Sequence, residues 1–268
     1  MFFRKKSYLP LSALLQGTDI PKLSFCISHK NRVPYLKQTL RQNLEDNRVD
    51  QAMVEFVLVD FGSDEDLVPW LLSEFSADLS SGYLRFFQTN VLKEWHACIA
   101  KNTVHRLAKG AILVNLDCDN FTGARGGKFV IDSFTQAKEN LMWWQYSKKK
   151  LDGTFGRIGM TRDIFEKLGG YDESLLPMGY QDGDLKDRAL ALGLRLCHER
   201  NPAFNQAIKN EKYTPTNMTW KAMNEQNERT SRANVKAGRL VANGGTFGIG
   251  MNIYWLNAEK GEMEACQE

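Results

Sequence analysis

The chain has 268 residues, of which 43% are hydrophobic and 25% are charged. This composition is typical of a folded protein and excludes disorder, collagen or coiled coil as a description of the whole chain. A net charge of only +3 argues against a nucleic-acid partner. Five scattered cysteines argue against a disulfide framework and favour a cytoplasmic location. No apolar run is long enough for a membrane-spanning segment.

Apolar runs alternate with helical periodicity through the first half of the sequence. Short, nearly continuous apolar runs predict buried strands at residues 23–28, 54–59, 83–87 and 111–116. Apolar residues at three- and four-residue spacing predict helices at residues 33–44, 67–75 and 95–107. Because strands alternate with helices, we expect an α/β fold in which helices flank a mixed, mainly parallel sheet.

The second half is less regular. Strands are predicted at residues 142–146 and 157–160, and helices at 162–168, 182–192 and within 218–235. The glycine-rich segment 123–128 is predicted to be a mobile loop. From Asn201 on there is little sheet signal, and the glycines between 244 and 250 interrupt any long element. We therefore expect one domain over residues 1–208 and a helical or irregular extension over residues 209–268, packed on or near the functional site.

Two acids follow the fourth predicted strand at once. If the chain stays extended there, Asp117 and Asp119 point to the same side. Ligands of open α/β folds bind at this carboxyl edge of the sheet. Paired carboxylates attract a hard cation such as Mg²⁺ or Mn²⁺, which in turn binds phosphate. The pattern indicates a metal–diphosphate site, although a solvated turn is the structural alternative.

Other polar side chains are expected at the same edge. Asp60 ends the second strand, where it would bind a base or ribose, or cap a helix. Ser28 and Arg32 follow the first strand, and a guanidinium group can bind phosphate bidentately, although a surface arginine is the alternative. Asp182 begins a predicted helix, whose N-terminus favours the ionised form. It is either a helix cap or a general base.

Six segments in this order resemble a known family. They are Cys-Ile-Ser-His-Lys-Asn-Arg (26–32), Val-Asp-Phe-Gly-Ser (59–63), Ala-Lys-Asn (100–102), Leu-Asp-Cys-Asp (116–119), Gly-Gly-Tyr-Asp-Glu (169–173) and Gln-Asp-Gly-Asp-Leu (181–185). Together they resemble nucleotide-sugar glycosyltransferases of the GT-A (Rossmann-like) fold. The resemblance is strongest to family-2-type enzymes and to the C-terminal half of the β-1,4-galactosyltransferase and chondroitin-polymerase group, and it covers about residues 22–206.

The resemblance implies a metal-dependent hexosyltransferase. A sugar would move, with inversion, from a nucleoside-diphosphate donor, expected to be UDP-linked, to a hydroxyl of a glycan, a lipid-linked acceptor or a protein. Asp117 and Asp119 match the Asp-x-Asp motif that holds Mn²⁺ or Mg²⁺ and the diphosphate, and Asp182 matches the catalytic base. The remaining matches are donor contacts: Ser28, Arg32, Asp60, Lys101, Gly170, Tyr171 and Asp172.

Three positions depart from the family pattern. Gln181 replaces the first acid of the usual Glu-Asp pair, and Lys101 replaces the usual arginine. Asn205 stands where related enzymes have a metal-binding histidine; His198 is nearby, so the third metal ligand is His198, Asn205 or neither. A sugar nucleotidyltransferase is the second reading, but those enzymes carry a glycine-rich loop where this chain has residues 28–32. A non-catalytic nucleotide-sugar-binding module is the third.

Overall fold

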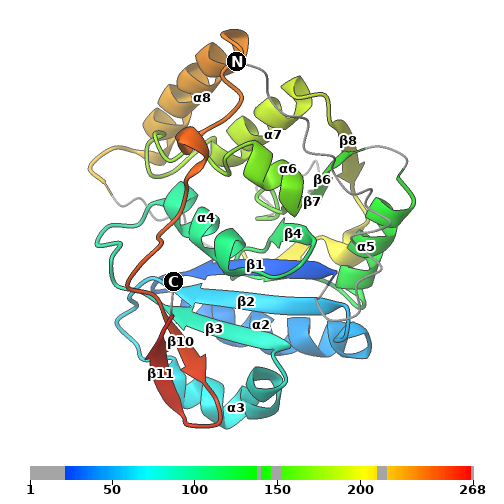
Figure 1. Cartoon of the computed structure of the whole chain (residues 1–268), viewed down its shortest axis with the longest axis vertical. Coiled ribbons are helices and arrows are strands. Elements are labelled where there is room, and N and C mark those ends of the chain that lie inside the picture. Colours follow the sequence, from blue (N-terminus) through cyan, green and yellow to red (C-terminus); the bar gives the residue numbers. More distant parts are fainter. Residues whose placement is uncertain (1–21, 138–139, 146–152, 210–215, 267–268) are drawn as a thin grey trace.

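The computed structural model describes residues 22–137, 140–145, 153–209 and 216–266. A nine-stranded sheet runs through the described part of the chain, with the strand order β11-β10-β3-β2-β1-β4-β7-β6-β8 (Figure 1). A separate two-stranded sheet pairs β5 (Asn120–Phe121) with β9 (Gln206–Ala207). The sheet and the helices around it form the mixed, mainly parallel α/β fold that the sequence predicts.

The four central strands are parallel to one another. They are β1 (Leu23–His29), β2 (Val54–Asp60), β3 (Leu84–Gln88) and β4 (Ile112–Asn115). The sheet continues beyond β4 through β7 (Ile158–Thr161), β6 (Leu141–Gln145) and β8 (Arg195–Glu199), in which β7 is antiparallel to both of its neighbours. Because the central strands share one direction, the loops that follow β1, β2 and β4 meet at one edge of the sheet.

Helices cover both faces of the sheet (Figure 1). One face packs against α2 (Val33–Asn47), α3 (Val68–Ser80) and α5 (Gly126–Thr135); the other packs against α4 (Ala97–Leu107), α6 (Arg162–Lys167) and α7 (Gln181–Ala191). Alternate residues of β1 serve the two sides, because Phe25 and Ile27 pack with the first group and Cys26 with the second. This burial on both faces explains why the central strands are nearly continuous in apolar residues.

The start of α2 illustrates how the sequence forms these elements. Pro34 suits the first turn, because its missing N–H would have no partner there. Val33, Leu36, Leu40 and Leu44 follow at helical spacing and are all at most 5% exposed. The helix therefore buries the apolar face that the periodicity predicts.

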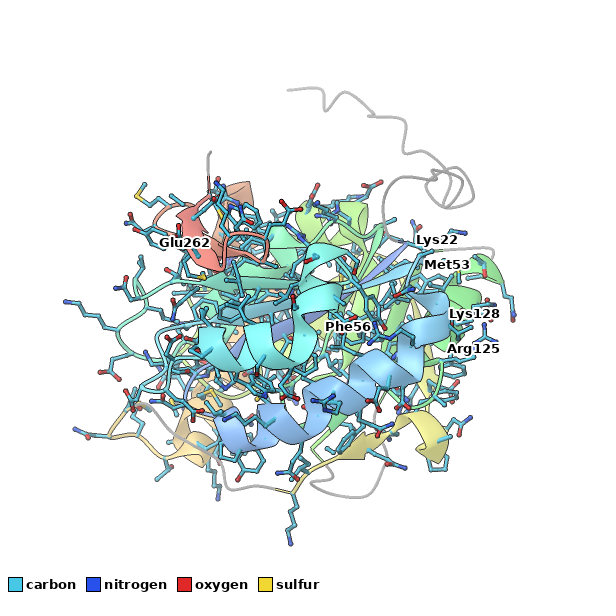
Figure 2. All side chains as sticks on the ribbon, turned by 90° about the horizontal axis from the view of Figure 1, so that it is seen from below. Lys22, Met53, Phe56, Arg125, Lys128 and Glu262 are labelled. Carbon is cyan, nitrogen blue, oxygen red and sulfur yellow. The ribbon has the colours of Figure 1, made fainter. Side chains whose placement is uncertain are left out.

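Half of the segment 123–128, predicted as a loop, is helical, because α5 begins at Gly126. Figure 2 shows Arg125 and Lys128 beside the end of α2. The backbone N–H of Arg125 donates to the carbonyl of Asp46, and that of Gly127 donates to Asn47 Oδ1, both at 2.7 Å. A Cβ at Gly127 would lie 2.6 Å from a methyl carbon of Val54. A glycine at position 127 therefore permits this close packing against Val54.

The C-terminal extension contributes both a helix and a hairpin. Helix α8 (Trp220–Lys236) matches the helix predicted within residues 218–235, and the structure packs it on α7. Strands β10 (Tyr254–Asn257) and β11 (Glu262–Ala265) were missed, because each is only four residues long and β11 alternates acids with small or apolar residues. β10 pairs antiparallel with β3 and so extends the central sheet (Figure 1). The domain division at residue 208 stays a prediction.

Short 3₁₀ turns complete the described elements: η1 (Arg48–Asp50), η2 (Pro202–Phe204) and η3 (Asn243–Gly245). Within the described ranges, every helix is too short or too polar to cross a bilayer.

Candidate active site at the carboxyl edge of the sheet

A cavity of about 380 Å³ opens at the carboxyl edge of the central strands. Its walls come from the loops after β1 and β4, from α4, from the start of α7 and from the start of α8. The described residues that line it are Ser28, Lys30, Asn31, Arg32, Trp95, Ala97, Lys101, Asp117, Cys118, Asp119, Met178, Gln181, Asp182 and Trp220. The cavity thus brings together six polar residues that the sequence predicts for the site: Ser28, Arg32, Lys101, Asp117, Asp119 and Asp182.

Lys101 links two of the acids in this cavity. Its ammonium group lies 2.7 Å from Asp182 Oδ1 and 3.9 Å from Asp117 Oδ1, and its side chain is only 5% exposed. It also lies 5.2 Å from the centre of the Tyr171 ring. Burial raises the pKa of Asp182 above its ordinary value, and the charge of Lys101 offsets part of that rise. Asp182 is therefore a buried carboxylate whose proton affinity is enhanced, as a general base requires.

Asp117 and Asp119 lie in the loop after β4, where neighbouring amides orient them. Asn115 Nδ2 donates to Asp117 Oδ1 at 3.0 Å, and Asn120 Nδ2 donates to Asp119 Oδ1 at 2.6 Å. The guanidinium group of Arg32 lies 3.5 Å from Asp119 Oδ2. Their side chains are 34% and 14% exposed, so both acids remain accessible to a ligand.

The donor set fits a hard divalent cation. Asp117 and Asp119 offer carboxylate oxygens two residues apart on the wall of one cavity. The described residues contain no group of three His, Cys, Asp or Glu side chains placed to hold a metal. Two carboxylates nevertheless suffice where water and substrate phosphate complete the shell, which is the usual arrangement for Mg²⁺.

Neither candidate for a third metal ligand is among the described residues that line the cavity. The ring of His198 faces Trp144, at 6.0 Å between centres, and its Nδ1 lies 2.9 Å from a nitrogen of Arg200. Both amide atoms of Asn205 are buried without a hydrogen-bond partner among the described residues. Which of the two residues, if either, contacts a metal stays a prediction.

Asp60 is fully buried behind the cavity and does not line it. Its Oδ1 accepts from His29 Nδ1 at 3.0 Å, and its Oδ2 accepts from the backbone N–H of Ser63 at 3.1 Å. Burial alone would raise the pKa of Asp60, but the hydrogen bonds from His29 and Ser63 outweigh it and lower the pKa. His29 Nε2 in turn accepts from the backbone N–H of Arg32 at 3.2 Å. Asp60 thus holds the loop that carries Arg32.

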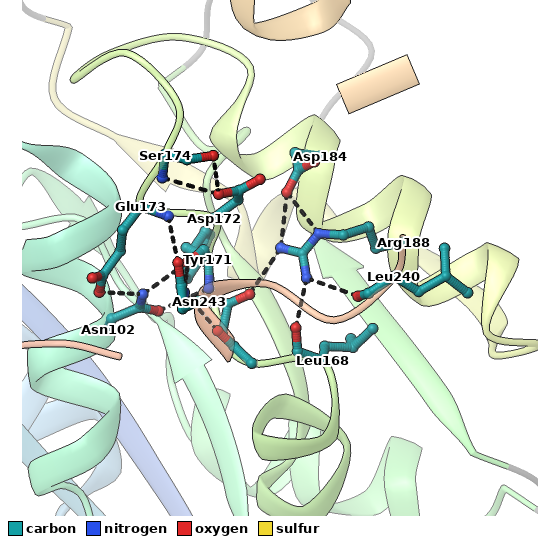
Figure 3. A network of polar contacts seen from close by, with 12 residues as sticks. Asn102, Leu168, Tyr171, Asp172, Glu173, Ser174, Asp184, Arg188, Leu240 and Asn243 are labelled. Atoms are coloured by element: carbon teal, nitrogen blue, oxygen red, sulfur yellow. Dashed lines mark hydrogen bonds and ion pairs between the residues drawn. The ribbon is translucent and has the colours of Figure 1, made fainter. Parts of the chain in front are cut away.

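Gly170, Tyr171 and Asp172 also lie outside the cavity lining. Figure 3 shows Tyr171 and Asp172 in a polar network that includes Asn102. Asn102 accepts from the Tyr171 N–H and donates to the Tyr171 carbonyl, each at 2.8 Å. Gly170 has φ of +68°, and a Cβ there would lie 2.4 Å from Asn102 Oδ1. In this structure the segment supports the wall behind Lys101, and its contact with a donor stays a prediction.

The C-terminal extension holds this segment in place. Asn243 Nδ2 donates to the carbonyls of Gly169 and Tyr171 at 2.7 Å, and its Oδ1 accepts from the Glu173 N–H at 2.9 Å (Figure 3). From α7, Arg188 donates to the Gly170 carbonyl at 2.8 Å while it pairs with Asp184. These contacts satisfy backbone groups that a buried turn would otherwise leave unpaired.

A second asparagine holds the loop that leads into Asp182. Asn227, on α8, is 1% exposed and accepts from the Leu176 N–H at 2.7 Å. Its amide group faces three carbonyls, those of Leu176, Met178 and Gly179, at 2.7–3.2 Å. The extension therefore fixes the segment that positions the candidate base.

Part of this cavity was not predicted from the sequence. Lys30 and Asn31 lie in the predicted donor segment 28–32, but neither had a predicted role. Trp95, Met178 and Trp220 reach the cavity from three distant segments. In the sequence, only their residue type could have pointed to a binding site. That signal is weak, because a tryptophan is more often part of a core than of a binding site.

No protein-family model matches this chain, and no curated protein matches it in sequence. Solved structures do match its fold. The mannosyltransferase PcManGT from Pyrobaculum calidifontis, in complex with GDP-Man and Mn²⁺, superposes with a TM-score of 0.62 at 18% identity; the match covers 85% of this chain and 70% of that one.

TarS 1-349 from S. aureus, in complex with UDP-GlcNAc, gives a TM-score of 0.58 at 14% identity, over 74% of this chain and 61% of that one. The same TarS fragment without a named ligand gives a TM-score of 0.55 at 13% identity, over 69% of this chain and 60% of that one. The chain thus has the Rossmann-like GT-A fold on which these glycosyltransferases are built.

Proposed function

We propose that this chain is a glycosyltransferase that moves a hexosyl group from a nucleoside-diphosphate donor to a hydroxyl acceptor, with inversion. The observation that carries the proposal is the meeting of Asp182 and Asp117 at one buried ammonium group, Lys101, inside a cavity at the carboxyl edge of the sheet. The fold shared with solved glycosyltransferases supports it. The closer resemblance to the galactosyltransferase and chondroitin-polymerase group and the cytoplasmic location remain part of this proposal.

The donor diphosphate is assigned to the end of the cavity that carries Arg32, Asp117 and Asp119. Asp117 and Asp119 would hold Mn²⁺ or Mg²⁺, which when bound supplies Lewis-acid stabilisation of the leaving diphosphate. Arg32 would contribute a second positive charge, because a guanidinium group pairs well with phosphate oxygens. One similar structure holds GDP-Man and another holds UDP-GlcNAc, so these structures leave the nucleotide open. We propose a UDP-linked sugar, as the family resemblance implies, and keep a GDP-linked sugar as the alternative.

We assign Asp182 as the base that removes the proton from the acceptor hydroxyl. Its carboxylate lies on the cavity wall, so an acceptor bound there can transfer its proton as the oxygen attacks the anomeric carbon. One base and one displacement from the face opposite the diphosphate give inversion, by analogy with single-displacement glycoside chemistry. Lys101, at 2.7 Å, stabilises the ionised form of Asp182 that accepts the proton.

The test is a thermal-shift screen of UDP- and GDP-sugars with and without Mn²⁺, followed by analysis of the released products. A ligand that binds the folded chain stabilises it in proportion to its affinity. We expect a cation-dependent shift with one nucleotide sugar and slow release of nucleoside diphosphate. Release of pyrophosphate from a nucleoside triphosphate would instead identify a nucleotidyltransferase, and binding without any turnover would identify a non-catalytic module.

A further inference from the structure

The cavity has two ends that carry different side chains. The charged end carries Arg32, Asp117 and Asp119, and the aromatic end carries Trp95, Met178 and Trp220 beside Asp182. The residues that hydrogen-bond to metal-binding side chains orient them, and they affect metal affinity even though they do not touch the metal. The question for the charged end is therefore what orients its two acids.

Each acid of the charged end is held by a buried asparagine. Asn115 Nδ2 donates to Asp117 Oδ1, and Asn120 Nδ2 donates to Asp119 Oδ1. Both asparagines are at most 1% exposed, so solvent does not compete for their amide groups. Because an amide nitrogen carries two N–H groups, the partner of the second N–H helps to fix the direction of the first.

One short segment, residues 153–157, accepts the second N–H of both asparagines. Asn115 Nδ2 also donates to the carbonyl of Gly156 at 2.9 Å, and Asn120 Nδ2 also donates to the carbonyl of Gly153 at 3.1 Å. The segment lies directly before β7 and so comes well after both acids in the sequence. A single segment therefore completes the hydrogen bonds that orient both acids.

Arg157, at the end of this segment, fixes which way the Asn120 amide faces. Its side chain is 1% exposed, and its Nη2 donates to Asn120 Oδ1 at 2.8 Å. Because a guanidinium group has donors and no acceptor, the amide oxygen has to face Arg157, and the amide nitrogen then faces Asp119. The reverse orientation would place two acceptors, the amide oxygen and the carboxylate, against each other.

Arg157 is held in place from two further segments. It donates to Gln145 Oε1, on β6, at 3.3 Å. It also donates to the carbonyl of Phe204 and, at 3.3 Å, to that of Gln206. The guanidinium group is thus fixed on several sides, so its contact with Asn120 does not depend on a freely moving side chain.

Gly156 leaves room for the other acid. A Cβ at this position would lie 2.7 Å from Asp117 Oδ2 and 3.3 Å from Lys101 Nζ. Gly156 is not among the glycines with positive φ, so the close approach of these side chains, and not the backbone conformation, favours a glycine here. An added methyl group would therefore displace the Asp117 carboxylate and leave the backbone where it is.

We propose that residues 153–157 are a positioning segment, which orients Asp117 and Asp119 and so sets how tightly the charged end binds a divalent cation. Arg157 acts through Asn120, and Gly156 acts through its carbonyl and through the space it leaves. None of the five residues is among the described residues that line the cavity. The proposal rests on the proposed function and identifies residues behind the cavity on which its metal affinity depends.

The first test compares two glycines by electron paramagnetic resonance of Mn²⁺, alone and with UDP or GDP. Gly156→Ala should weaken Mn²⁺ binding by about tenfold, because an acid that holds the cation is displaced, while urea denaturation shows a folded chain. Gly159→Ala is the matched control. A Cβ there would lie 3.0 Å from a methyl carbon of Val114, and its nearest atoms belong to no acid. Gly159→Ala should therefore leave the Mn²⁺ affinity unchanged, even if it lowers stability.

The second test asks whether Arg157 acts through Asn120. Arg157→Met and Asn120→Ala should each weaken Mn²⁺ binding by about tenfold, and Arg157→Lys, which keeps a charged donor, should restore part of the loss. The double variant should bind Mn²⁺ no more weakly than Asn120→Ala alone, whereas independent effects would multiply. Gly156→Ala keeps the buried network whole, so it tests the proposal even if Arg157→Met fails to fold.

NMR of the Asn120 side-chain amide gives a readout that needs no metal. In the unchanged chain its Nδ2 protons should exchange slowly with water, because both are hydrogen-bonded in a buried site. In Arg157→Lys they should exchange faster, and in Gly159→Ala they should not change. Exchange in Arg157→Lys that equals that of the unchanged chain would show that Arg157 does not fix the amide.

Two further results would overturn the proposal: Gly156→Ala binds Mn²⁺ as tightly as the unchanged chain, or the losses in Arg157→Met and Asn120→Ala multiply in the double variant. If UDP or GDP binds with Mn²⁺ and these variants bind both normally, the positioning segment fails alone. If the unchanged chain binds no Mn²⁺ with or without nucleotide, but the Asn120 amide responds as expected, the metal assignment of the proposed function fails and the orientation of the acids stands.

Discussion

The two ends of the cavity are built in different ways. The charged end takes its side chains from loops that directly follow β1 and β4, so each acid or base stands next to a strand in the sequence. The aromatic end joins residues 95, 178–182 and 220, which come together only when α7 and α8 pack. A short sequence motif can therefore predict the charged end. The aromatic end cannot be predicted in this way, because its residues are brought together only by the tertiary structure.

The two ends also differ in what holds them. At the charged end, Asn115 and Asn120 orient acids one or two residues away. At the aromatic end, Asn227 reaches from the extension to backbone groups about 50 residues earlier in the chain. Asn243 does the same, about 70 residues away, for the wall behind Lys101. Substitutions in different parts of the cavity should therefore have different effects. Some should change donor binding, some should change the transfer step, and some should change the stability of the fold.

The largest expected effect is that of Asp182→Asn. It should lower transfer by about 10²–10⁴-fold, because a positioned base is lost, while donor affinity changes little. Steady-state transfer and donor titration measure the two quantities. Asp132→Asn, in an exposed ion pair on α5, is the control and should behave like the unchanged chain. Near-normal transfer by the Asp182 variant would show that the base lies elsewhere.

Asp119→Asn should break the charged end alone. At a nucleotide concentration of about 100 times Kd, the unchanged chain should gain about 2.7 kcal/mol of stability. Most of this gain should vanish in the variant, as it should in the unchanged chain when EDTA removes the cation. Thermal unfolding with and without Mn²⁺ checks both outcomes. An equal gain in the presence of EDTA would mean that the nucleotide binds without a metal.

Asn227→Ala should weaken the support of the aromatic end. The buried backbone groups of the 176–179 loop lose their partner, which should lower the free energy of unfolding by about 1–3 kcal/mol. Urea denaturation measures the change. Asn217→Ala, at an exposed asparagine just before α8, is the control. If both variants unfold at the same urea concentration, the contacts of Asn227 contribute nothing to stability.

The smallest expected effect is on the pH profile. Burial raises the pKa of Asp182, so kcat/KM should fall on the acid side with a midpoint above pH 3.8, as the carboxylate becomes protonated. Lys101→Met removes the charge that favours the ionised form and should move this midpoint to higher pH, whereas Lys101→Arg should keep it. A midpoint that moves to lower pH in Lys101→Met would contradict the ion pair.

Much of the fold could be predicted because burial on both faces leaves continuous apolar runs in β1, β2 and β4. The acids after these strands could be predicted for the same reason, since strand ends are recognisable. Trp220 and Asn227 could not, because nothing local distinguishes a helix residue that lines a cavity, or one that bonds to a distant loop, from one that faces solvent. The β10–β11 hairpin could not, because each strand is only four residues long and β11 alternates acids with small or apolar residues.

The pairing of β10 with β3 has a practical consequence. A chain cut after residue 208 would lose the neighbour of β3 and so present an unpaired row of N–H and C=O groups to other molecules. The same cut would remove Asn227 and Asn243. The shortened protein would therefore tend to self-associate through strand addition. A loss of activity after such a truncation would then reflect aggregation and would not by itself identify a catalytic role for the removed residues.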